Sequence, residues 1–452
     1  MRKRHILAIS AVMLATVWAG ATPLDDYIAN PDPSYTYRVV RTIDAPRGEV
    51  CVIDMTSQTW RSQHEVSRTV WQHWLTIIVP DNVAFDTALL WINGGRNGGA
   101  APTGPDEMLT DIAFQSRSVV ADLQMVPNQP LVFADDPGRQ RYEDAIIACT
   151  FDKFLKIEDP NWPLLLPMVK SAVRAMDTIQ NHLVETSQGR LKIERFVVCG
   201  ASKRGWTTWL TAAVDPRVRA IAPVVIDVLN MGPQMRHHFA AYGFYSQAIG
   251  DYEQMKVLDR LDERGGAEIR NFVDPYAYRE RYTLPKFLIN STGDQFFLPD
   301  AARFYFDDLL DEKHLLYCAN TDHSLDGSEA DKALTAWYVA ILTGRDLPQF
   351  RWETPEAGRT VVASQTTPQQ VTLWTATNPT ARDFRLETIG KAWRSAPLEP
   401  DGAGGYVANV AVPDKGWTAY FVELQFDLGP PLPCRFSTPV CIIPDTLPFA
   451  GR

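Results

Sequence analysis

The chain has 452 residues, too many for one ordinary hydrophobic core, and its length therefore predicts two domains. Its composition, 45% hydrophobic and 22% charged, is that of a globular protein, and it contains no repeat or low-complexity tract. The net charge of −10, without a basic patch, argues against nucleic acid as a partner.

The first 21 residues have the pattern of a signal peptide that is removed on export. Residues 1–5 are basic, residues 6–18 form an apolar run, and Ala19-Gly20-Ala21 has the small residues of a cleavage site. The apolar run is too short to span a bilayer comfortably. We expect a periplasmic or secreted protein without stable membrane insertion after cleavage; an N-terminal anchor helix that is never cleaved is the alternative.

Residues 70–345 alternate strand-like and helix-like segments. Several strand-like runs are almost continuous Val, Ile and Leu, as expected for strands buried on both faces of a parallel sheet. The clearest helix covers residues 168–183, where apolar side chains recur at helical spacing. The alternation predicts an α/β domain over residues 22–349, with a mostly parallel sheet flanked by helices. The expected strands are 74–79, 88–92, 118–123, 196–199, 220–226, 286–289 and 315–318.

Residues 227–285 separate two of these strands by far more than a usual connection. The segment is rich in aromatic residues and is interpreted either as a cap inserted over an active site or as a peripheral helical subdomain. His237 and His238 are adjacent rather than four positions apart, so they are expected to be cap residues rather than metal ligands.

The character of the sequence changes near residue 350. Short runs of alternating polar and apolar residues follow, separated by turn signals, and they predict a β-sandwich over residues 350–452. In the last run, alternate residues from Thr418 to Phe426 share one apolar face. The expected strands are 371–375, 383–387, 406–412 and 418–426.

The six cysteines allow disulfides in an exported protein, but their connectivity stays open. Cys199 and Cys318 lie in expected core strands and are predicted to be buried thiols. Cys434 and Cys441 cannot bond on one continuous strand and would pair only if the chain turns between them. No cluster of Cys and His has metal-ligand spacing, so neither a metal nor another cofactor is expected.

Ser202 is the expected nucleophile of a hydrolase. An apolar strand runs into Gly200-Ala-Ser202-Lys-Arg-Gly205-Trp, and a helical stretch follows. This strand, tight turn and helix with Ser at the apex is typical of a nucleophile elbow, in which the helix N-terminus adds positive potential. The second Gly comes one residue later than usual, with Arg204 in its place. A Gly-x-Ser turn that only caps a helix is the alternative.

Asp294 is the expected acid of a triad with Ser202, because such triads run in the order Ser, acid, His along an α/β-hydrolase chain. Asp294 follows the strand at 286–289 and lies at its carboxyl end. The rival acid, Asp300, follows Pro299 at the start of a helix, where Asp is a common first-turn residue.

His323 is the expected base of this triad. It follows the strand at 315–318, at the edge where the elbow opens, whereas His314 precedes that strand at its wrong end. We expect His323 to act as general base toward Ser202 and then as acid toward the leaving group, oriented by Asp294. The alternative is that His323 is only a loop residue and Asp294 only a turn residue, without a catalytic role.

An oxyanion hole needs two backbone N–H groups. Lys203, which follows the nucleophile, is the first expected donor. The glycine-rich loop after the strand at 88–92 supplies the second, for which Gly95 is preferred over Gly94 and Arg96. This loop lacks the ending of a phosphate-binding loop, and a flexible surface turn is the alternative.

The adjacent acids Glu143-Asp144 open an expected helix, where they favour its N-terminus; a role in substrate binding is the lesser alternative.

Six motifs along the chain together point to one known protein family: Glu143–Ala148, Gly200–Trp206, Thr292–Phe297, Thr321–Ser324, Asn378–Arg385 and Gly416–Glu423. Through them the chain resembles the PhoPQ-activated pathogenicity-related protein family over nearly its whole mature length. The resemblance implies an α/β-hydrolase domain followed by an immunoglobulin-like domain, bacterial export, and in some members a link to virulence and resistance to antimicrobial peptides. It supplies no substrate. The elbow is also similar to that of carbohydrate glucuronoyl esterases over a short stretch.

These features together predict an exported serine hydrolase that cleaves an ester through an acyl-enzyme on Ser202. The substrate is expected to be a small molecule, a carbohydrate ester or a peptide. A secreted serine peptidase is one alternative. A hydrolase-like scaffold used for binding or signalling is the other, because a fold alone does not determine a function.

Overall fold

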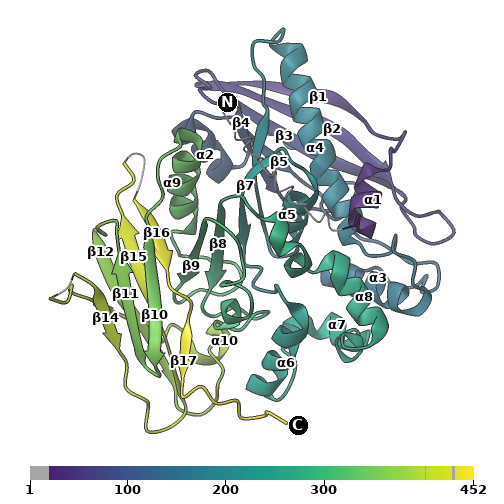
Figure 1. Cartoon of the computed structure of the whole chain (residues 1–452). Helices are drawn as coiled ribbons and strands as arrows, with labels where there is room; N and C mark the ends of the chain where they lie inside the picture. Colours follow the sequence, from purple (N-terminus) through teal and green to yellow (C-terminus); the bar gives the residue numbers. More distant parts are fainter. Residues whose placement is uncertain (1–19, 403, 430–432, 452) are drawn as a thin grey trace, which may run out of the picture.

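The computed structural model describes residues 20–402, 404–429 and 433–451 (Figure 1). The predicted signal peptide falls outside these residues, except for its last two positions. The first helix, α1 (Pro23–Ala29), begins at Thr22, whose side chain and that of Asp25 each bond the other's backbone N–H. This reciprocal capping box stabilises the first turn of the described chain.

A nine-stranded sheet forms the centre of the molecule, in the order β1-β2-β3-β5-β4-β6-β7-β8-β9. The strands β1, β2, β3 and β5 pair antiparallel, and all the pairs from β5 to β9 are parallel. The parallel part contains every strand that the apolar runs predict beyond residue 80. The strands are β1 (Thr36–Ala45), β2 (Gly48–Thr59), β3 (Val70–Pro80), β4 (Thr87–Ile92), β5 (Val120–Leu123), β6 (Arg195–Ala201), β7 (Val218–Val224), β8 (Lys286–Ser291) and β9 (Lys313–Cys318).

Helices cover both faces of this sheet, which explains why its parallel strands are almost entirely apolar. On one face α2 (Glu107–Ser116) and α9 (Ala330–Thr343) share a buried core with the sheet. On the other face lie α3 (Asp144–Ile157), α4 (Leu165–Thr186) and α5 (Lys203–Val214). The predicted helix at 168–183 is confirmed as part of α4. This sheet order, with helices on both faces, is the α/β-hydrolase fold.

The long connection between β7 and β8 is helical and lies at the carboxyl edge of the parallel strands (Figure 1). It contains no strand among its described residues. Its elements are α6 (Met231–Tyr242), η1 (Gln247–Ile249), α7 (Gly250–Gln254), η2 (Leu258–Arg260), α8 (Arg264–Val273) and η3 (Pro275–Arg281).

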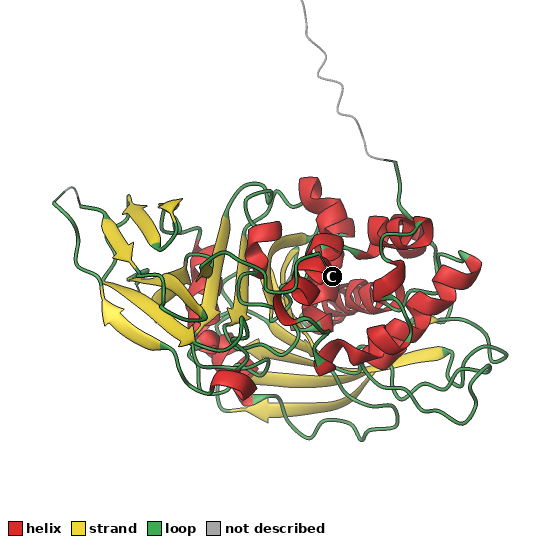
Figure 2. Cartoon of the chain, turned by 90° about the horizontal axis from the view of Figure 1, so that it is seen from below, coloured by secondary structure: helices red, strands yellow, loops and turns green. Residues whose placement is uncertain are grey.

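From Phe350 onward the described chain forms two antiparallel sheets, which lie together at one end of the molecule, on the left in Figure 2. One sheet has the order β10-β11-β14, and the other β13-β12-β15-β16, with β17 also pairing with β15. The strands are β10 (Phe350–Glu356), β11 (Arg359–Ser364), β12 (Gln370–Asn378), β13 (Arg394–Pro397), β14 (Tyr406–Asn409), β15 (Trp417–Phe426), β16 (Cys434–Ser437) and β17 (Cys441–Ile443).

The strand predicted at 383–387 is wrong. Side chains replace the sheet ladder there: Asn378 Oδ1 accepts from Thr380 N at 3.0 Å, and the carboxylate of Asp383 accepts from Arg385 N and from the hydroxyl of Thr388. These local bonds turn the chain out of the sheet, and the short helix α10 (Leu386–Ile389) forms instead.

The cysteines are free thiols, and Cys199 and Cys318 are buried as predicted. Cys434 and Cys441 do not face each other, because β16 and β17 lie one after the other along β15. Cys434 is opposite Phe426 and Cys441 is opposite Tyr420.

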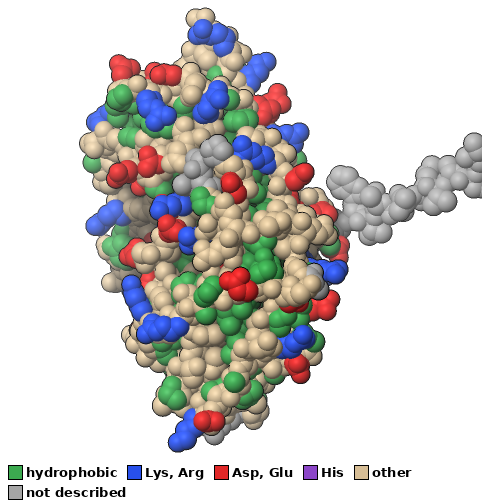
Figure 3. Space-filling view, turned by 90° about the vertical axis from the view of Figure 1, so that its left-hand side faces the viewer, with side chains coloured by type: hydrophobic (Ala, Val, Ile, Leu, Met, Phe, Trp, Pro, Cys, Tyr) green, Lys and Arg blue, Asp and Glu red, His purple; other side chains and the backbone are tan. Residues whose placement is uncertain are grey.

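The side of the molecule seen in Figure 3 carries Lys and Arg side chains interspersed with Asp and Glu, without a continuous field of one sign. In the described part of the chain, none of the helices combines the length and the apolar character needed to cross a bilayer.

Candidate active site

Ser202 lies at the apex of a tight turn between β6 and α5, where its backbone has φ 58° and ψ −128°. A non-glycine residue in this region costs about 1–3 kcal/mol and persists only where its surroundings impose it. Two glycines permit the turn: a Cβ at Gly200 would lie 2.7 Å from the carbonyl oxygen of Arg204, and one at Gly205 would lie 2.8 Å from that of Gly200. Gly205, although one position late, therefore provides the close approach of strand and helix.

Asp294 and His323, expected from the sequence to be partners, are in contact. Asp294 follows β8, is buried, and accepts from Phe296 N at 2.7 Å through Oδ1. Its other oxygen lies 2.8 Å from His323 Nδ1. The His323 ring packs on Phe296 with centroids 4.4 Å apart, and its backbone N–H donates to Gln295. A carboxylate at Nδ1 places the proton on that nitrogen and leaves the lone pair at Nε2.

Ser202 is near this pair at the carboxyl edge of the sheet. Ser202 borders the same cavity as Phe296 and Phe297, whose rings both contact His323. Within the described chain, neither the Ser202 hydroxyl nor His323 Nε2 has a hydrogen-bond partner, so both remain available to a substrate. Hydrogen bonds of this kind commonly tighten only when substrate is bound.

The two rival residues have structural partners instead. Asp300 is buried, with its carboxylate 2.7 Å from Arg382 and 3.0 Å from His237. Burial opposes ionisation of Asp300, but the charge of Arg382 and the hydrogen bonds with Arg382 and His237 outweigh it and lower the pKa of Asp300. His314 is buried at the start of β9, with Nε2 3.2 Å from the carbonyl oxygen of Pro348. Neither rival contacts His323.

The glycine-rich loop after β4 is held close to the elbow. Gly95 has φ +142°, and a Cβ there would lie 3.1 Å from Met125 Cγ, so this position requires glycine. Its carbonyl accepts from Gln129 Nε2 at 2.9 Å. The amides of Gly95 and Lys203 donate no hydrogen bond to another described residue, the latter because it begins a helix. Both amides are therefore free to donate to an oxyanion, and their role as the oxyanion hole stays a prediction.

Glu143, interpreted from the sequence mainly as the opening of a helix, connects the elbow to that loop. Its carboxylate lies 2.8 Å from Lys203 Nζ and 2.7 Å from Arg204, the two residues after the nucleophile. It also accepts from Gln129, whose amide holds the carbonyl of Gly95. Glu143 has φ 49° and ψ −124°, close to the strained backbone of Ser202. The sequence indicates this network only through an acidic pair, Glu143-Asp144, and a basic pair, Lys203-Arg204, which lie about sixty positions apart.

Asp144 extends this network into the long β7–β8 connection. One of its oxygens lies 3.0 Å from Lys203 Nζ, and the other accepts from the hydroxyl of Tyr252 on α7 at 2.9 Å. The elbow is therefore connected to residues 227–285 through Asp144, by an ion pair with Lys203 and a hydrogen bond from Tyr252, which favours the cap interpretation of that segment.

We predict that Glu143→Gln changes the acid stability of the protein. Burial opposes ionisation of Glu143, but the hydrogen bond from Arg204 and the charge of Lys203 outweigh it and lower the pKa of Glu143 from 4.5 to about 2. The stability that the ionised Glu143 contributes is fully present above the unfolded pKa of 4.5 and is lost as the pH falls toward the folded pKa of about 2. The Tm of the wild type, measured by circular dichroism, should therefore fall more steeply than that of Glu143→Gln between pH 4.5 and pH 2. Equal slopes would show that this carboxylate contributes no net stability.

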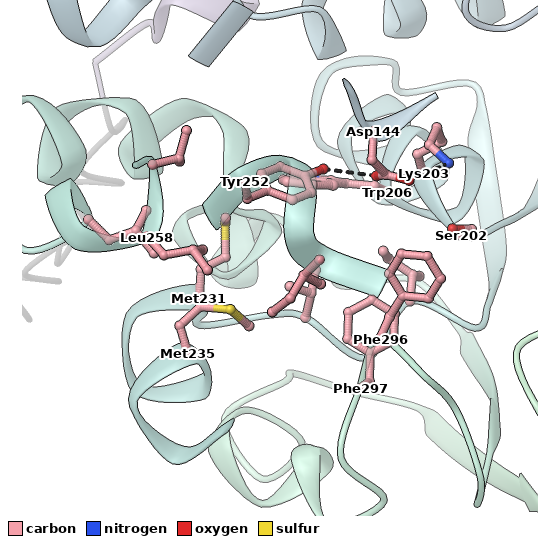
Figure 4. Close-up of a pocket in the computed structure, with 15 residues that line it drawn as sticks. Asp144, Ser202, Lys203, Trp206, Met231, Met235, Tyr252, Leu258, Phe296 and Phe297 are labelled. Atoms are coloured by element: carbon pink, nitrogen blue, oxygen red, sulfur yellow. Dashed lines mark hydrogen bonds and ion pairs between the residues drawn. The ribbon is translucent and has the colours of Figure 1, made fainter. Parts of the chain in front are cut away.

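A cavity opens at Ser202 and continues beneath the β7–β8 connection (Figure 4). It holds about 590 Å³ of empty space, including solvent at its mouth. Figure 4 shows Ser202 on one side with Phe296 and Phe297 beside it, and Leu258 on the opposite side. The connection contributes Met231, Met235, Ile249, Tyr252, Val257 and Leu258 to its wall. Across the described part of the chain, no three His, Cys, Asp or Glu side chains gather as metal ligands.

The C-terminal antiparallel region supports the loops that carry the acid and the base. The backbone N–H of Leu386 donates to the carbonyl of Gly293 at 3.0 Å, directly before Asp294. Asn320, three residues before His323, exchanges hydrogen bonds with the backbone of Trp393. This contact between distant parts of the chain could not be inferred from the sequence pattern.

Comparison with known proteins adds one close relative and several remote structures. The acetyl xylan esterase from Paenibacillus sp. R4 is 13% identical, with 71% of this chain and 91% of that chain covered and a TM-score of 0.48. The glucuronoyl esterase from Solibacter usitatus is 12% identical, with 72% and 91% covered and a TM-score of 0.41. Autocrine proliferation repressor protein A of Dictyostelium discoideum is 37% identical over 480 residues, which include 100% of this chain and 96% of that protein.

The family comparison agrees with the resemblance seen in the sequence motifs. The sequence profile named "PhoPQ-activated pathogenicity-related protein" matches residues 24–385, which include the elbow, the acid and the base. The matched part extends from the start of α1 to the loop before α10. The chain therefore belongs to the PhoPQ-activated pathogenicity-related protein family.

Proposed function

We propose that this protein is a serine hydrolase that cleaves a carboxylic ester through an acyl-enzyme on Ser202. The observation that carries the proposal is the contact between His323 Nδ1 and Asp294 at 2.8 Å, at the edge of the sheet where the strained turn presents Ser202. A histidine oriented in this way by a buried carboxylate, beside a serine at a nucleophile elbow, is the arrangement that activates a serine hydroxyl.

The reaction proceeds in two steps. Nε2 of His323 takes the proton of the Ser202 hydroxyl while Oγ attacks the ester carbonyl carbon, and Asp294 stabilises the imidazolium that forms. The oxyanion accepts hydrogen bonds from the amides of Lys203 and Gly95. Return of the proton to the leaving oxygen breaks the ester bond and releases the alcohol. Water then attacks the acyl-enzyme with His323 as base, which releases the acid and restores Ser202.

An ester is favoured over a peptide because the cavity offers no free carboxylate to hold a peptide's terminal ammonium. Asp144, the acidic side chain that lines it, is already bonded to Lys203 and Tyr252. The name of the Dictyostelium relative describes repression of proliferation rather than a reaction, so signalling without turnover is the second candidate.

Covalent labelling separates these two candidates. The purified protein is treated with a fluorophosphonate, which reacts with activated serines, and the modified peptide is identified by mass spectrometry. We expect one label, at Ser202, that is absent from Ser202→Ala. Ser324→Ala is the matched control, because Ser324 follows His323 but its hydroxyl donates to Asp322, and it should label normally. A wild-type protein that stays unlabelled while a known serine hydrolase reacts would overturn the proposal in favour of signalling.

We also propose that the chain is exported and cleaved after Ala21. The proposal is supported by the capping box at Thr22, which begins helix α1 directly after the predicted cleavage site. The intact mass of the protein from the periplasm or medium should lack the first 21 residues; a retained N-terminus would point to the anchor-helix alternative.

A further inference from the structure

The cavity beside Ser202 has an apolar wall, because its polar groups are already bonded within the protein. The Tyr252 hydroxyl donates to Asp144 at 2.9 Å, and the other oxygen of Asp144 lies 3.0 Å from Lys203 Nζ. The indole N–H of Trp206 donates to a backbone carbonyl at 2.5 Å. A polar substrate group placed against this wall would lose water without gaining a partner, which costs free energy. The cavity therefore disfavours sugar hydroxyls and charged groups.

The opposite wall is formed by flexible apolar side chains of the β7–β8 connection. Met231 and Met235 lie one helical turn apart on α6 and are largely buried, as is Val257. Unbranched thioether side chains adapt to the shape of an apolar ligand. This wall lies across the cavity from Ser202 in Figure 4, so the cavity extends away from the nucleophile.

The chemistry of the proposed reaction determines which part of a substrate enters this cavity. The leaving oxygen must reach His323 to receive its proton, and His323 does not line the cavity. Ser202, which bonds to the acyl carbon, lines it, and so does Lys203, whose amide is expected to hold the oxyanion. The substituent on the acyl carbon therefore points into the cavity, while the alcohol points toward His323.

We propose that the cavity is an acyl pocket and that the substrates are esters with an apolar hydrocarbon acyl group, longer than acetyl. The inference rests on the proposed hydrolysis at Ser202. Each buried methylene adds about 0.8 kcal/mol of transfer free energy, which corresponds to about a fourfold gain in kcat/KM while the chain still fits. The alcohol side gains no such benefit, because it lies outside the cavity.

A series of p-nitrophenyl esters from acetyl to octanoyl, used below their micellar concentrations, tests the proposal. We expect kcat/KM to rise about fourfold for each methylene over the first members and then level off as the pocket is filled. A parallel series of acetyl esters with lengthening alcohols should stay flat. The rate of fluorophosphonate labelling at Ser202 is measured on the same samples.

Met235→Gln then places an amide in the wall without changing its volume much. We expect this variant to lose about tenfold or more in kcat/KM for the octanoyl ester, because the amide stays without a partner when the chain binds. The loss in labelling rate and in kcat/KM for the acetyl ester should be smaller, because the acetyl group is too short to extend along the wall that contains Met235. Met108→Gln on α2, outside the cavity, is the matched control and should resemble the wild type in all three.

Each outcome separates this inference from the proposed function. Labelling at Ser202 with no preference for longer acyl groups, or with a preference for longer alcohols, would overturn the acyl pocket and leave the hydrolase intact. An unchanged octanoyl rate in Met235→Gln would do the same. Failure of the wild type to label would overturn both.

Discussion

Alanine at position 323 is expected to lower kcat for a cleavable ester by about a millionfold. His323 is the base that the geometry offers to Ser202, with Asp294 at 2.8 Å from its other nitrogen. Without this base the hydroxyl is a weak nucleophile, and removal of the histidine from such a triad costs about as much as removal of the whole triad. The measurement is kcat with a chromogenic ester at saturation, together with the Tm to show that the variant is folded.

Two further variants make this result specific. Asp294→Asn keeps the shape of the side chain but favours the wrong histidine tautomer, so we expect kcat to fall by about 10⁴-fold. His64→Ala removes an exposed histidine in the connection between β2 and β3 and should leave kcat unchanged. If His323→Ala retained a tenth of the wild-type kcat, another residue would have to act as the base.

Asparagine at position 300 is expected to lower the free energy of unfolding by about 3–5 kcal/mol without a comparable loss of kcat. Asp300 and Arg382 are both buried, and their side chains lie 2.7 Å apart. Removing the negative charge leaves the Arg382 guanidinium buried without its counter-ion, and removal of one partner of a buried ion pair is strongly destabilising. Because the folded-state pKa of Asp300 is lowered, the pair stabilises the protein above the unfolded pKa of an aspartate.

The matched control is Asp445→Asn, which removes an exposed carboxylate on the same cluster. Asp445 is 54% exposed and lies 2.9 Å from Arg303, so its loss should cost at most about 1 kcal/mol. The measurement is chemical denaturation followed by tryptophan fluorescence, with kcat corrected for the folded fraction. Normal stability of Asp300→Asn combined with a loss of kcat would reassign the triad acid from Asp294 to Asp300.

The parallel strands were predictable because burial on both faces demands continuous apolar runs, and β4 and β6 to β9 are almost wholly buried. The strand β1 gave no such signal, because all of its residues are exposed or only partly buried and its sequence mixes polar and apolar residues. The strand predicted at 383–387 is wrong because its alternating pattern is typical of a strand, whereas the side chains of Asn378 and Asp383 accept hydrogen bonds from nearby backbone N–H groups in place of a neighbouring strand.

The elbow was predictable because all of its determinants lie within a few residues. These determinants are the strand, Gly200, Ser202, Gly205 and the helix that follows, which are adjacent in the sequence. The steric limits on such a turn act between neighbouring residues, so the sequence reveals them. The candidates Asp294 and His323 followed from chain order and from the rule that parallel strands end at one edge, and the structure places them in contact. The catalytic roles of the three residues stay predictions that the experiments above address.

The sequence by itself thus determined the parallel strands of the α/β-hydrolase sheet and the turn that presents Ser202, because these depend on local sterics and on the burial of apolar residues. Only the tertiary structure decided that Glu143 and Asp144 bind the residues after the nucleophile, that Asp300 belongs with Arg382, and that residues 227–285 enclose an apolar cavity. Those contacts join side chains that are tens of residues apart in the sequence. Whether such side chains meet depends on the path of the folded backbone, and no local sequence pattern encodes that path.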